Sequence, residues 1–417
     1  MGTFRFAYFN KFLDVTIPDA NLVEKLQTAK APALDDVYKE TRSALTSPIG
    51  TVPLKNSVGE NSSVLLAVPD KSRHTDVREI LWAVLDELLE AGVKKDNITI
   101  IIALGTHRAM SGKEIAAKIG EKIATQFNVV NHDHNTPSAL IDFGQTDDGV
   151  PAVFNKLIAE NDFVISIGNI SAHPVGGYSG GAKGLLPGLA SPRTIFSLHW
   201  DAIQFPLFDI FGKADNPMRT RMEKVVGMAG LDFIVNTTEN ADREISGIFA
   251  GHYIDAHRAG VKFMQSSPLM AFPLEMSDVL IIGLGSDRPD FWAGAAGIYA
   301  AAALLNEGGT LVLFAGCPEG VAPEHPVVLD YGYPHYKELI KHVESGKIND
   351  KTGASHVVTI GKIIVEKKIK VILVSRGISK AEAFKLGFGF CDDPQKAVDL
   401  AIAGASADAR VLFYERI

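Results

Sequence analysis

Cysteine, long hydrophobic runs and surplus positive charge are all scarce in this sequence. The two cysteines, Cys317 and Cys391, are too few for a disulfide framework or a cysteine-rich metal site. The longest apolar run, 291–305, is rich in Ala and Gly and shorter than the roughly 18 residues that a membrane span requires. The 41 basic and 49 acidic residues give a formal net charge of −8, so we expect neither nucleic acid nor membrane as a partner.

The first residues also lack the continuous apolar core of a secretory leader, and with so few cysteines this predicts a cytoplasmic protein. The composition is otherwise typical of a folded globular protein, with 46% hydrophobic and 22% charged residues. A chain of 417 residues is roughly two to three times the length of a common domain. We therefore expect two domains.

Short β-branched runs alternate with helical patterns from about residue 63 onward. The expected buried strands lie at residues 63–68, 98–103, 163–168 and 370–375, with a further strand beginning near 277. Helices are expected at about 112–126 and, in an Ala-rich segment, at 293–305. Near-continuous apolar strands separated by helices are typical of parallel sheets. The fold class predicted is α/β, with two α/β domains, mostly parallel sheets and a cleft between them.

The expected domain boundary lies near residue 270. An N-terminal domain over 1–270 carries the reactive side chains described below, and a C-terminal α/β domain covers 271–400. The end of the chain, 400–417, is apolar enough to return to the first domain as a strand. Two prolines in 265–277 make that segment a candidate hinge for domain closure.

Polar and titratable side chains follow the predicted strands of the first domain. They are Asp70 and Arg73, His107 and Arg108, the group His132, Asp133 and His134, and His173. The carboxyl ends of parallel strands share one edge of a sheet, where ligands bind. One such histidine alone is more often structural, but four loops together predict a functional site.

Glycines crowd the segment after His173. Gly176, Gly177 and Gly180 allow backbone N–H groups to approach an anion closely, and Ser179 adds a hydroxyl donor. Lys183 among them could bind phosphate as an ammonium or act as a nucleophile when uncharged. The alternative is a flexible loop with a solvated lysine, but leucines in the same segment favour a packed one.

Familiar cofactor motifs are missing. Lys183 lacks the following Ser or Thr of a P-loop, and Arg288 stands where a dinucleotide fingerprint needs its third glycine. No HExxH motif or cysteine pair accompanies His199, so zinc is not indicated. From the residues alone His199 is an ordinary helix histidine, and it becomes a metal ligand only if a cofactor supplies the other donors.

Taken together, these residues resemble the nickel-pincer lactate racemase family. The similarity lies in DKSR at 70–73, GTHR at 105–108, and the segment 173–199 with its SGGAKG and LPG stretches and closing histidine. It covers about 60–200 well and the second domain only as general α/β architecture. Several motifs in the same order are far more specific than a lone glycine pattern.

The resemblance implies a covalent nickel-pincer nucleotide, the pyridinium-3-thioamide-5-thiocarboxylic acid mononucleotide, which holds nickel through one carbon and two sulfurs. Lys183 would form the covalent link and His199 would be the protein ligand of nickel. The glycine loop would hold the phosphate of the cofactor, through Gly176, Gly177, Ser179 and Gly180. Cofactor-building enzymes are the implied partners, and a chain made without them would carry a free Lys183.

The resemblance also implies an isomerase, a racemase or epimerase of a small-molecule 2-hydroxy acid. His107 and His173 would be acid and base on opposite faces of the substrate while hydride moves between C2 and the cofactor. Arg73 would clamp the carboxylate, and Asp70 would orient that arginine or contact the cofactor.

The second domain departs from lactate-specific members of the family. Those members have a Tyr-Gln pair and a Lys that help to bind the carboxylate, whereas 290–297 here contains neither Gln nor Lys. Their later Trp is also missing, with His356 in that region, and Arg288 could replace the lost cation. We therefore expect a larger substrate than lactate, either an aldonic acid or one whose aryl group faces Trp292.

Two other functions remain open from the sequence. One is an NAD(P)-dependent 2-hydroxy acid dehydrogenase, which would bind a dinucleotide tightly without a covalent adduct. The other is a non-catalytic binding protein for acidic metabolites, which would keep its ligand affinity when His107 and His173 are lost.

Overall fold

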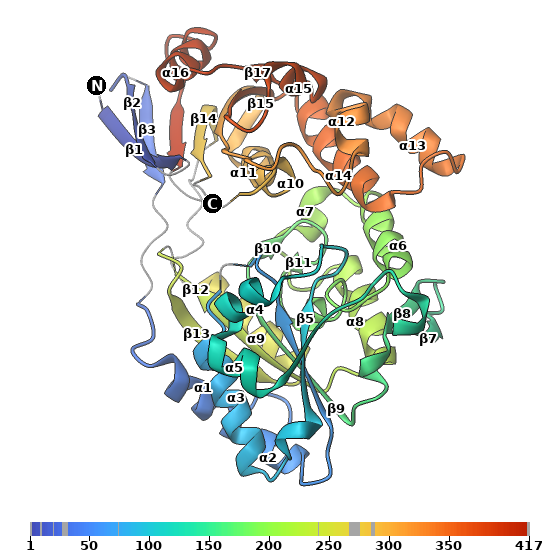
Figure 1. The fold of residues 1–417 in the computed structure, drawn as a ribbon. Coiled ribbons are helices and arrows are strands. Elements are labelled where there is room, and N and C mark those ends of the chain that lie inside the picture. The colour runs from blue at the N-terminus through green and yellow to red at the C-terminus, as the bar shows by residue number, and fades with distance from the viewer. Residues whose placement is uncertain are drawn as a thin grey trace. The chain divides into compact units, whose positions relative to one another are not determined.

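The computed structural model describes residues 2–8, 11–19, 21–26, 32–73, 75–240, 242–266, 276–284 and 288–414 (Figure 1). The chain forms two compact units. The larger unit is Thr28–Met270, and the smaller unit combines Met1–Gln27 with Ala271–Ile417. The candidate hinge at 265–277 falls mostly on 267–275, outside the described residues.

The division differs from the predicted one at both ends of the chain. Strand β3 (Leu22–Leu26) pairs in parallel with β18 (Val411–Tyr414), which itself pairs with β14 (Ser277–Gly283). Residues 1–27 therefore belong with the second half of the chain, and the last strand does not return to the first unit. This pairing spans almost the whole sequence, and no local pattern can reveal it.

The larger unit contains a six-stranded sheet in the order β13-β12-β9-β4-β5-β6. All neighbouring strands are parallel except β12 and β13. The strands are β4 (Val64–Pro69), β5 (Ile98–Ala103), β6 (Asn128–Asn131), β9 (Phe163–Asn169), β12 (Phe233–Glu239) and β13 (Ile245–Gly251). The three predicted strands of this unit and its α/β class are confirmed.

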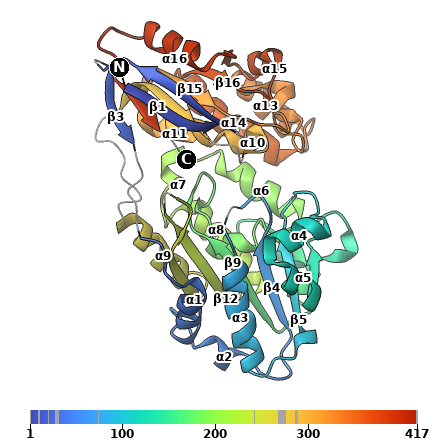
Figure 2. The ribbon, with the colours of Figure 1, turned by 60° about the vertical axis from the view of Figure 1, so that its left-hand side comes forward.

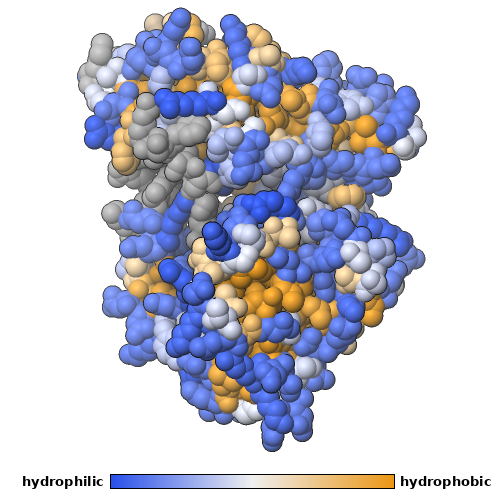
Figure 3. Space-filling view, in the orientation of Figure 1, coloured by the Kyte–Doolittle hydropathy of each residue, from blue (hydrophilic) through white to orange (hydrophobic). Residues whose placement is uncertain are grey.

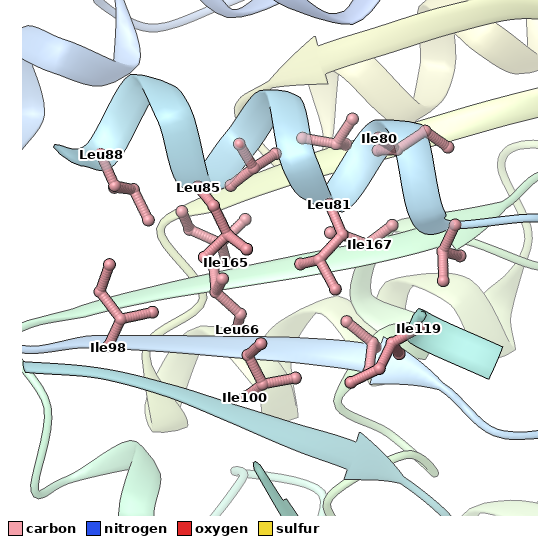
Figure 4. Close-up of a cluster of buried hydrophobic side chains, with 14 of the residues drawn as sticks. Leu66, Ile80, Leu81, Leu85, Leu88, Ile98, Ile100, Ile119, Ile165 and Ile167 are labelled. Carbon is pink, nitrogen blue, oxygen red and sulfur yellow. The ribbon is translucent and has the colours of Figure 1, made fainter. Parts of the chain in front are cut away.

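One face of this sheet is covered by helices with an apolar stripe. In α3 (Arg78–Glu90), Leu81, Leu85 and Leu88 recur at helical spacing and pack on residues of β4 and β5 (Figure 4). The helix predicted over 112–126 is two helices, α4 (Gly112–Ile119) and α5 (Glu121–Gln126). Gly120 between them has φ +92°, which no helix allows.

The other face carries the glycine-rich segment and two long helices. The helices are α6 (Pro192–Ala202) and α8 (Pro217–Ala229). Leu185, Leu186 and Leu189 are fully buried in the same hydrophobic cluster, so the segment is packed and not a free loop. The other helices and strands of the larger unit, on either face of the sheet, are α1 (Val37–Thr46), α2 (Leu54–Ser57), α7 (Leu207–Ile210), α9 (Asp255–Ser266), β7 (Leu140–Gln145), β8 (Pro151–Asn155), β10 (Ala172–His173) and β11 (Gly177–Tyr178) (Figure 1 and Figure 2).

The smaller unit has a parallel six-stranded sheet in the order β17-β16-β15-β14-β18-β3. Phe6 in the hairpin of β1 (Gly2–Tyr8) and β2 (Lys11–Ile17) packs against Phe314 of this sheet. The segment predicted as a helix over 293–305 begins as α10 (Phe291–Gly294) and continues as α11 (Ala296–Leu304). The other elements are β15 (Leu305–Phe314), β16 (Lys370–Val374), β17 (Gly389–Phe390), α12 (Val327–Tyr331), α13 (Tyr336–Glu344), α14 (Lys351–Gly361), α15 (Lys380–Lys385) and α16 (Pro394–Ala403).

The described helices include none that is both long and apolar enough to cross a membrane. On the face of the larger unit seen in Figure 3, hydrophobic residues gather in the middle with hydrophilic ones around them.

Candidate functional site

The predicted site residues all belong to the larger unit and follow neighbouring strands. Asp70 comes directly after β4, His107 four residues after β5, and His173 four residues after β9. Because β5, β4 and β9 are adjacent and parallel, their carboxyl ends meet at one edge of the sheet. The topology therefore brings these loops together, as the strand pattern predicts.

Asp70 and His107 form a hydrogen-bonded pair. Asp70 Oδ2 lies 2.7 Å from His107 Nδ1, and Ser72 donates to Oδ1 of the same carboxylate. Burial opposes ionisation of Asp70, but the hydrogen bond and positive charge of His107 outweigh it and lower the pKa of the carboxyl. An ionised Asp70 requires Nδ1 of His107 to carry hydrogen, so Nε2 is the nitrogen that can take up a proton.

This pairing assigns Asp70 a different contact from the ones expected. The carboxylate orients His107, whereas the sequence suggested that it would orient Arg73 or contact a cofactor. The charge of Arg73 still acts on Asp70 and helps to lower its pKa. The loop that carries Asp70 and Arg73 is held by Lys118. The amine of Lys118 donates to the carbonyls of Arg73 at 2.6 Å and Thr75 at 2.8 Å.

His173 is held in the opposite manner. Its Nδ1 accepts the backbone N–H groups of Val175 at 3.1 Å and Gly176 at 3.2 Å. Nε2 must therefore carry the hydrogen of the neutral ring. Burial, and then the positive charges of Lys183 and Arg73, lower the pKa of His173 well below its usual value. The imidazole is neutral at physiological pH and presents an N–H donor.

The glycines of the loop are required by close contacts within the unit. A Cβ on Gly177 would stand 2.0 Å from the carbonyl oxygen of Lys213, and one on Gly180 would stand 2.6 Å from Asn236 Oδ1. Both residues also have positive φ, at +73° and +76°. The N–H of Gly181 donates to Asn236 at 2.7 Å, so part of this backbone is engaged inside the protein.

Ser179 closes the loop. Its hydroxyl donates to the carbonyl of Asn169 and accepts the N–H of Ser171, both at 2.8 Å. The single hydrogen of the hydroxyl is thus used within the loop in this structure, so the role expected for Ser179 as an anion donor is not the one that the structure displays.

Lys183 is buried, with 9% of its surface exposed. Within the described part of the chain, its amine makes no hydrogen bond or ion pair. Burial, followed by the positive charges of Arg73 and Arg219, lowers the pKa of Lys183 well below its usual value. An uncharged amine of this kind is a nucleophile.

His199 lies in α6 and is fixed by its own helix. Nδ1 is 2.9 Å from the carbonyl oxygen of Ile195, one turn earlier, and must donate to it. The lone pair of the ring is therefore on Nε2, which is the usual arrangement of a histidine that ligates a metal. The charge of His199 acts on His173, so the two imidazoles lie within electrostatic range of each other.

Three other residues from the strand-end group have structural roles. His132 is buried, its Nδ1 accepts from Asn155 and its Nε2 donates to the carbonyl of Ala190, and burial lowers its pKa to about 4. Asp133 accepts the N–H groups of the turn that follows it. Arg108 forms a forked pair with Glu114.

Sequence reasoning missed Arg219. This side chain is fully buried in α8 and donates to the carbonyls of Gly176, Tyr178 and Gly180. The Asn-Pro that begins α8 indicates a helix start, but nothing in the sequence shows that its arginine turns into the core.

The aryl contact predicted for Trp292 stays a prediction. The indole stacks on His325, with ring centroids 4.5 Å apart, and on His356 at 4.3 Å. His356 is fixed in turn by Tyr333 and His325 by Asp350. Trp292 is thus already engaged by two imidazoles of its own unit.

The sequence of the chain matches characterised proteins of one kind. The model of the lactate racemase N-terminal domain matches residues 8–206. The chain is 29% identical over 318 residues to lactate racemase of Lactiplantibacillus plantarum, covering 75% of this chain and 74% of that protein. It is 28% identical over 325 residues to lactate racemase of Thermoanaerobacterium thermosaccharolyticum, covering 77% and 76%.

The fold matches two solved structures. Lactate racemase apoprotein from T. thermosaccharolyticum is similar with a TM-score of 0.87 and 24% identity, over 100% of this chain and 98% of that one. A protein from Thermotoga maritima is similar with a TM-score of 0.73 and 19% identity, over 91% and 97%. On the sequence matches and the motifs described above, this chain belongs to the lactate racemase family.

Proposed function

We propose that the protein is an isomerase that inverts C2 of a 2-hydroxy carboxylic acid. The observation that carries the proposal is the pair of differently held imidazoles, His107 and His173, beside the buried amine of Lys183. His107 has a carboxylate behind it and can accept a proton on Nε2, whereas His173 presents an N–H. A base that exchanges the hydroxyl proton on one side and an N–H donor that holds the same oxygen on the other suit inversion, because hydride leaves one face of C2 and returns to the opposite face.

The residues fit a nickel-pincer nucleotide. Lys183 would carry it through a covalent bond to its uncharged amine, and Nε2 of His199 would ligate nickel. Among the described residues no three His, Cys, Asp or Glu side chains gather as a metal site, so a single imidazole suits a metal whose other donors belong to a cofactor. When bound, the nucleotide would supply a hydride acceptor and donor.

The backbone of the glycine loop from Gly176 to Gly180 would lie against the cofactor. The close contacts at Gly177 and Gly180 keep this backbone in one conformation. We assign the hydroxyl of Ser179 a structural role within the loop. The phosphate of the cofactor would then be bound by backbone N–H groups and by nearby positive charge, of which Arg73 is one source.

The other residues bind and orient the substrate. Arg73 would bind the carboxylate with its planar fork, which fixes C2 relative to the two imidazoles. Asp70 keeps His107 in one tautomer and stabilises the imidazolium that forms when Nε2 takes the hydroxyl proton. His173 would donate a hydrogen bond to the substrate oxygen from the opposite face, and the proton held by His107 would return to that oxygen when hydride returns to C2.

The substrate that we propose is a polyhydroxy (aldonic) 2-hydroxy acid larger than lactate. The stretch 290–297 lacks the Gln and Lys of lactate-specific relatives, and the stacking of Trp292 on two imidazoles makes it a weaker partner for an aryl substrate.

The test is a panel of single enantiomers or epimers of 2-hydroxy acids, incubated with protein made alongside the cofactor-building enzymes. We expect loss of optical purity for an aldonic acid, near-stoichiometric nickel, and a mass increase on the peptide that contains Lys183. His107→Ala and His173→Ala should each abolish inversion, and Lys183→Ala should remove the cofactor. Full activity of the Lys183 variant would contradict the proposal.

The same experiment separates the alternatives. Tight binding of NAD(P) without a covalent adduct, together with net oxidation of the substrate, would indicate a dehydrogenase. Unchanged ligand affinity in His107→Ala and His173→Ala, with no turnover in the parent chain, would indicate a binding protein.

A further inference from the structure

The guanidinium of Arg219 is fully buried in the larger unit and makes three hydrogen bonds. Nε donates to the carbonyl of Gly176 at 3.0 Å and Nη1 to that of Gly180 at 3.2 Å, while Nη2 donates to Tyr178. One guanidinium thus binds three carbonyls of the glycine loop. A lysine could not do this, because its ammonium lacks the planar fork.

Within the described part of the chain, no carboxylate lies in ion-pair distance of Arg219. The nearby Glu223 is instead paired with Arg258, at 2.8 Å. Burial lowers the pKa of Arg219 to about 10, so the group remains charged at neutral pH. The core beneath the loop therefore holds a positive charge whose direct contacts are carbonyl dipoles, while Glu223 stabilises it from a distance.

This charge lies beside Lys183. The position of a Cβ on Gly176 would be 3.4 Å from Arg219 Nη2 and 3.5 Å from Lys183 Cδ. Because Gly176 has no side chain, the space between the guanidinium of Arg219 and the aliphatic carbons of Lys183 is only about as wide as a methyl group would fill. Gly176 therefore allows the two cationic side chains to approach on the inner side of the loop.

We propose that Arg219 is the positioning residue of this site, which holds the glycine loop in shape and, through its buried charge, prepares the Lys183 amine to react as a nucleophile. The inference rests on the proposed function in that Lys183 is the residue that carries the cofactor. It goes beyond that function because it names what makes one lysine of this chain different from the others.

The groups that face Lys183 support this division of roles. Burial is the main factor that disfavours the ammonium form of Lys183, and the charges of Arg73, from the loop after β4, and of Arg219, from α8, add to it. Lys183 in turn disfavours protonation of His173, which lies on β10. Arg73 is exposed and reserved for the substrate, so its effect is screened by solvent. The effect of buried Arg219 is not screened in this way.

The test is a pH titration of the Lys183 amine by NMR in the full chain, labelled with ¹⁵N-lysine and made without the cofactor-building enzymes. Lys183→Met assigns the signal. We expect the midpoint in the parent protein to lie below the usual value of about 10.4, and R219Q to raise it by at least one pH unit, which means about tenfold less neutral amine at a fixed pH. R219K, which keeps the charge, should leave the midpoint nearly unchanged.

Lys118 is the internal control, because it is also partly buried but donates to carbonyls of a different loop. Its midpoint should be the same in all variants. A purely structural role for Arg219 predicts lower melting temperatures for both R219Q and R219K with no shift at Lys183, and this outcome would overturn the proposal. If R219Q shows no cooperative melting, R219K is the deciding variant. An unchanged Lys183 midpoint in R219K supports the role of charge, and a Lys183 midpoint raised by one pH unit or more refutes that role.

The titration is independent of the proposed activity. A midpoint that is low and depends on Arg219, in a protein that gains no mass from the cofactor-building enzymes, would leave this inference standing and refute the proposed function. A cofactor-loaded racemase whose Lys183 midpoint does not depend on Arg219 would support the proposed function and refute this inference.

Discussion

His107 and His173 show how one side chain takes two chemical forms in a single site. A carboxylate behind Nδ1 gives His107 a basic outer nitrogen, whereas two backbone N–H groups at Nδ1 give His173 an outer N–H. The sequence shows only that a histidine follows each strand. The partner that decides the role comes from another strand for His107 and from the next turn for His173.

Replacing Asp70 by Asn tests the first of these arrangements. The amide of Asn would keep the shape but could donate to Nδ1, which would move the hydrogen of His107 to Nε2. We expect kcat to fall by about 10² to 10⁴ with a small change in KM, by analogy with other histidines that lose an orienting carboxylate. Initial rates of inversion measure this, with Asp133→Asn as the control, since Asp133 only caps a turn. Equal rates in the two variants would contradict the assigned role.

At the scale of elements, the site depends on loops that are held by contacts from neighbouring elements. Strands β4, β5 and β9 were predictable because long apolar runs define them, and the grouping of the loops at their ends follows from parallel pairing. The contacts of Arg219 and Lys118 were not predictable, because both are ordinary helix residues in sequence. Their burial depends on carbonyls 39 to 45 residues away.

Gly177→Ala should disrupt the loop. The added methyl would stand 2.0 Å from a carbonyl oxygen at a φ of +73°, so backbone must move. We expect a loss of unfolding free energy of roughly 2 kcal/mol or more, in the range of strained backbone sites. Gly112→Ala is the matched control, because a methyl there meets nothing within 4 Å. It should be neutral or stabilising by up to about 1 kcal/mol. Thermal and denaturant unfolding measure both, and similar losses in the two would be inconsistent with this account.

Lys118→Met should weaken substrate binding. The variant loses two charged hydrogen bonds that hold the backbone of Arg73 and Thr75, so the arginine is less well placed for a carboxylate. We expect KM to rise about tenfold with a smaller effect on kcat. Lys113→Met, an exposed position on the same helix, is the control. An unchanged KM for Lys118→Met would show that the loop keeps its shape without this contact.

At the scale of the whole molecule, several neutral histidines are buried. Burial lowers the pKa of His132 to about 4 and that of His356 to about 3, while unfolded chains protonate histidine near 6.5. At pH values between the lowered pKa and 6.5, these histidines are protonated in the unfolded state but neutral in the folded state. The free energy of unfolding therefore rises with pH in this window and falls as the solution is acidified.

His132→Gln isolates one contribution. The parent protein should lose up to about 3 kcal/mol from His132 alone between pH 6.5 and 4, and the variant should show a shallower slope over this interval. Chemical unfolding at a series of pH values measures the slope. His335→Gln is the control, because His335 is exposed. Identical slopes for the parent and the His132 variant would refute the burial argument.

The order of the chain in the smaller unit has a consequence for biosynthesis. Strand β3 is made before the larger unit, but its neighbour in the sheet, β18, is made after it. The larger unit is encoded between them as one uninterrupted stretch. On the ribosome, that insert can complete its own sheet while β3 waits for most of the polypeptide to emerge. The surroundings of Lys183 would thus form before the sheet that contains β3 and β18 can be completed.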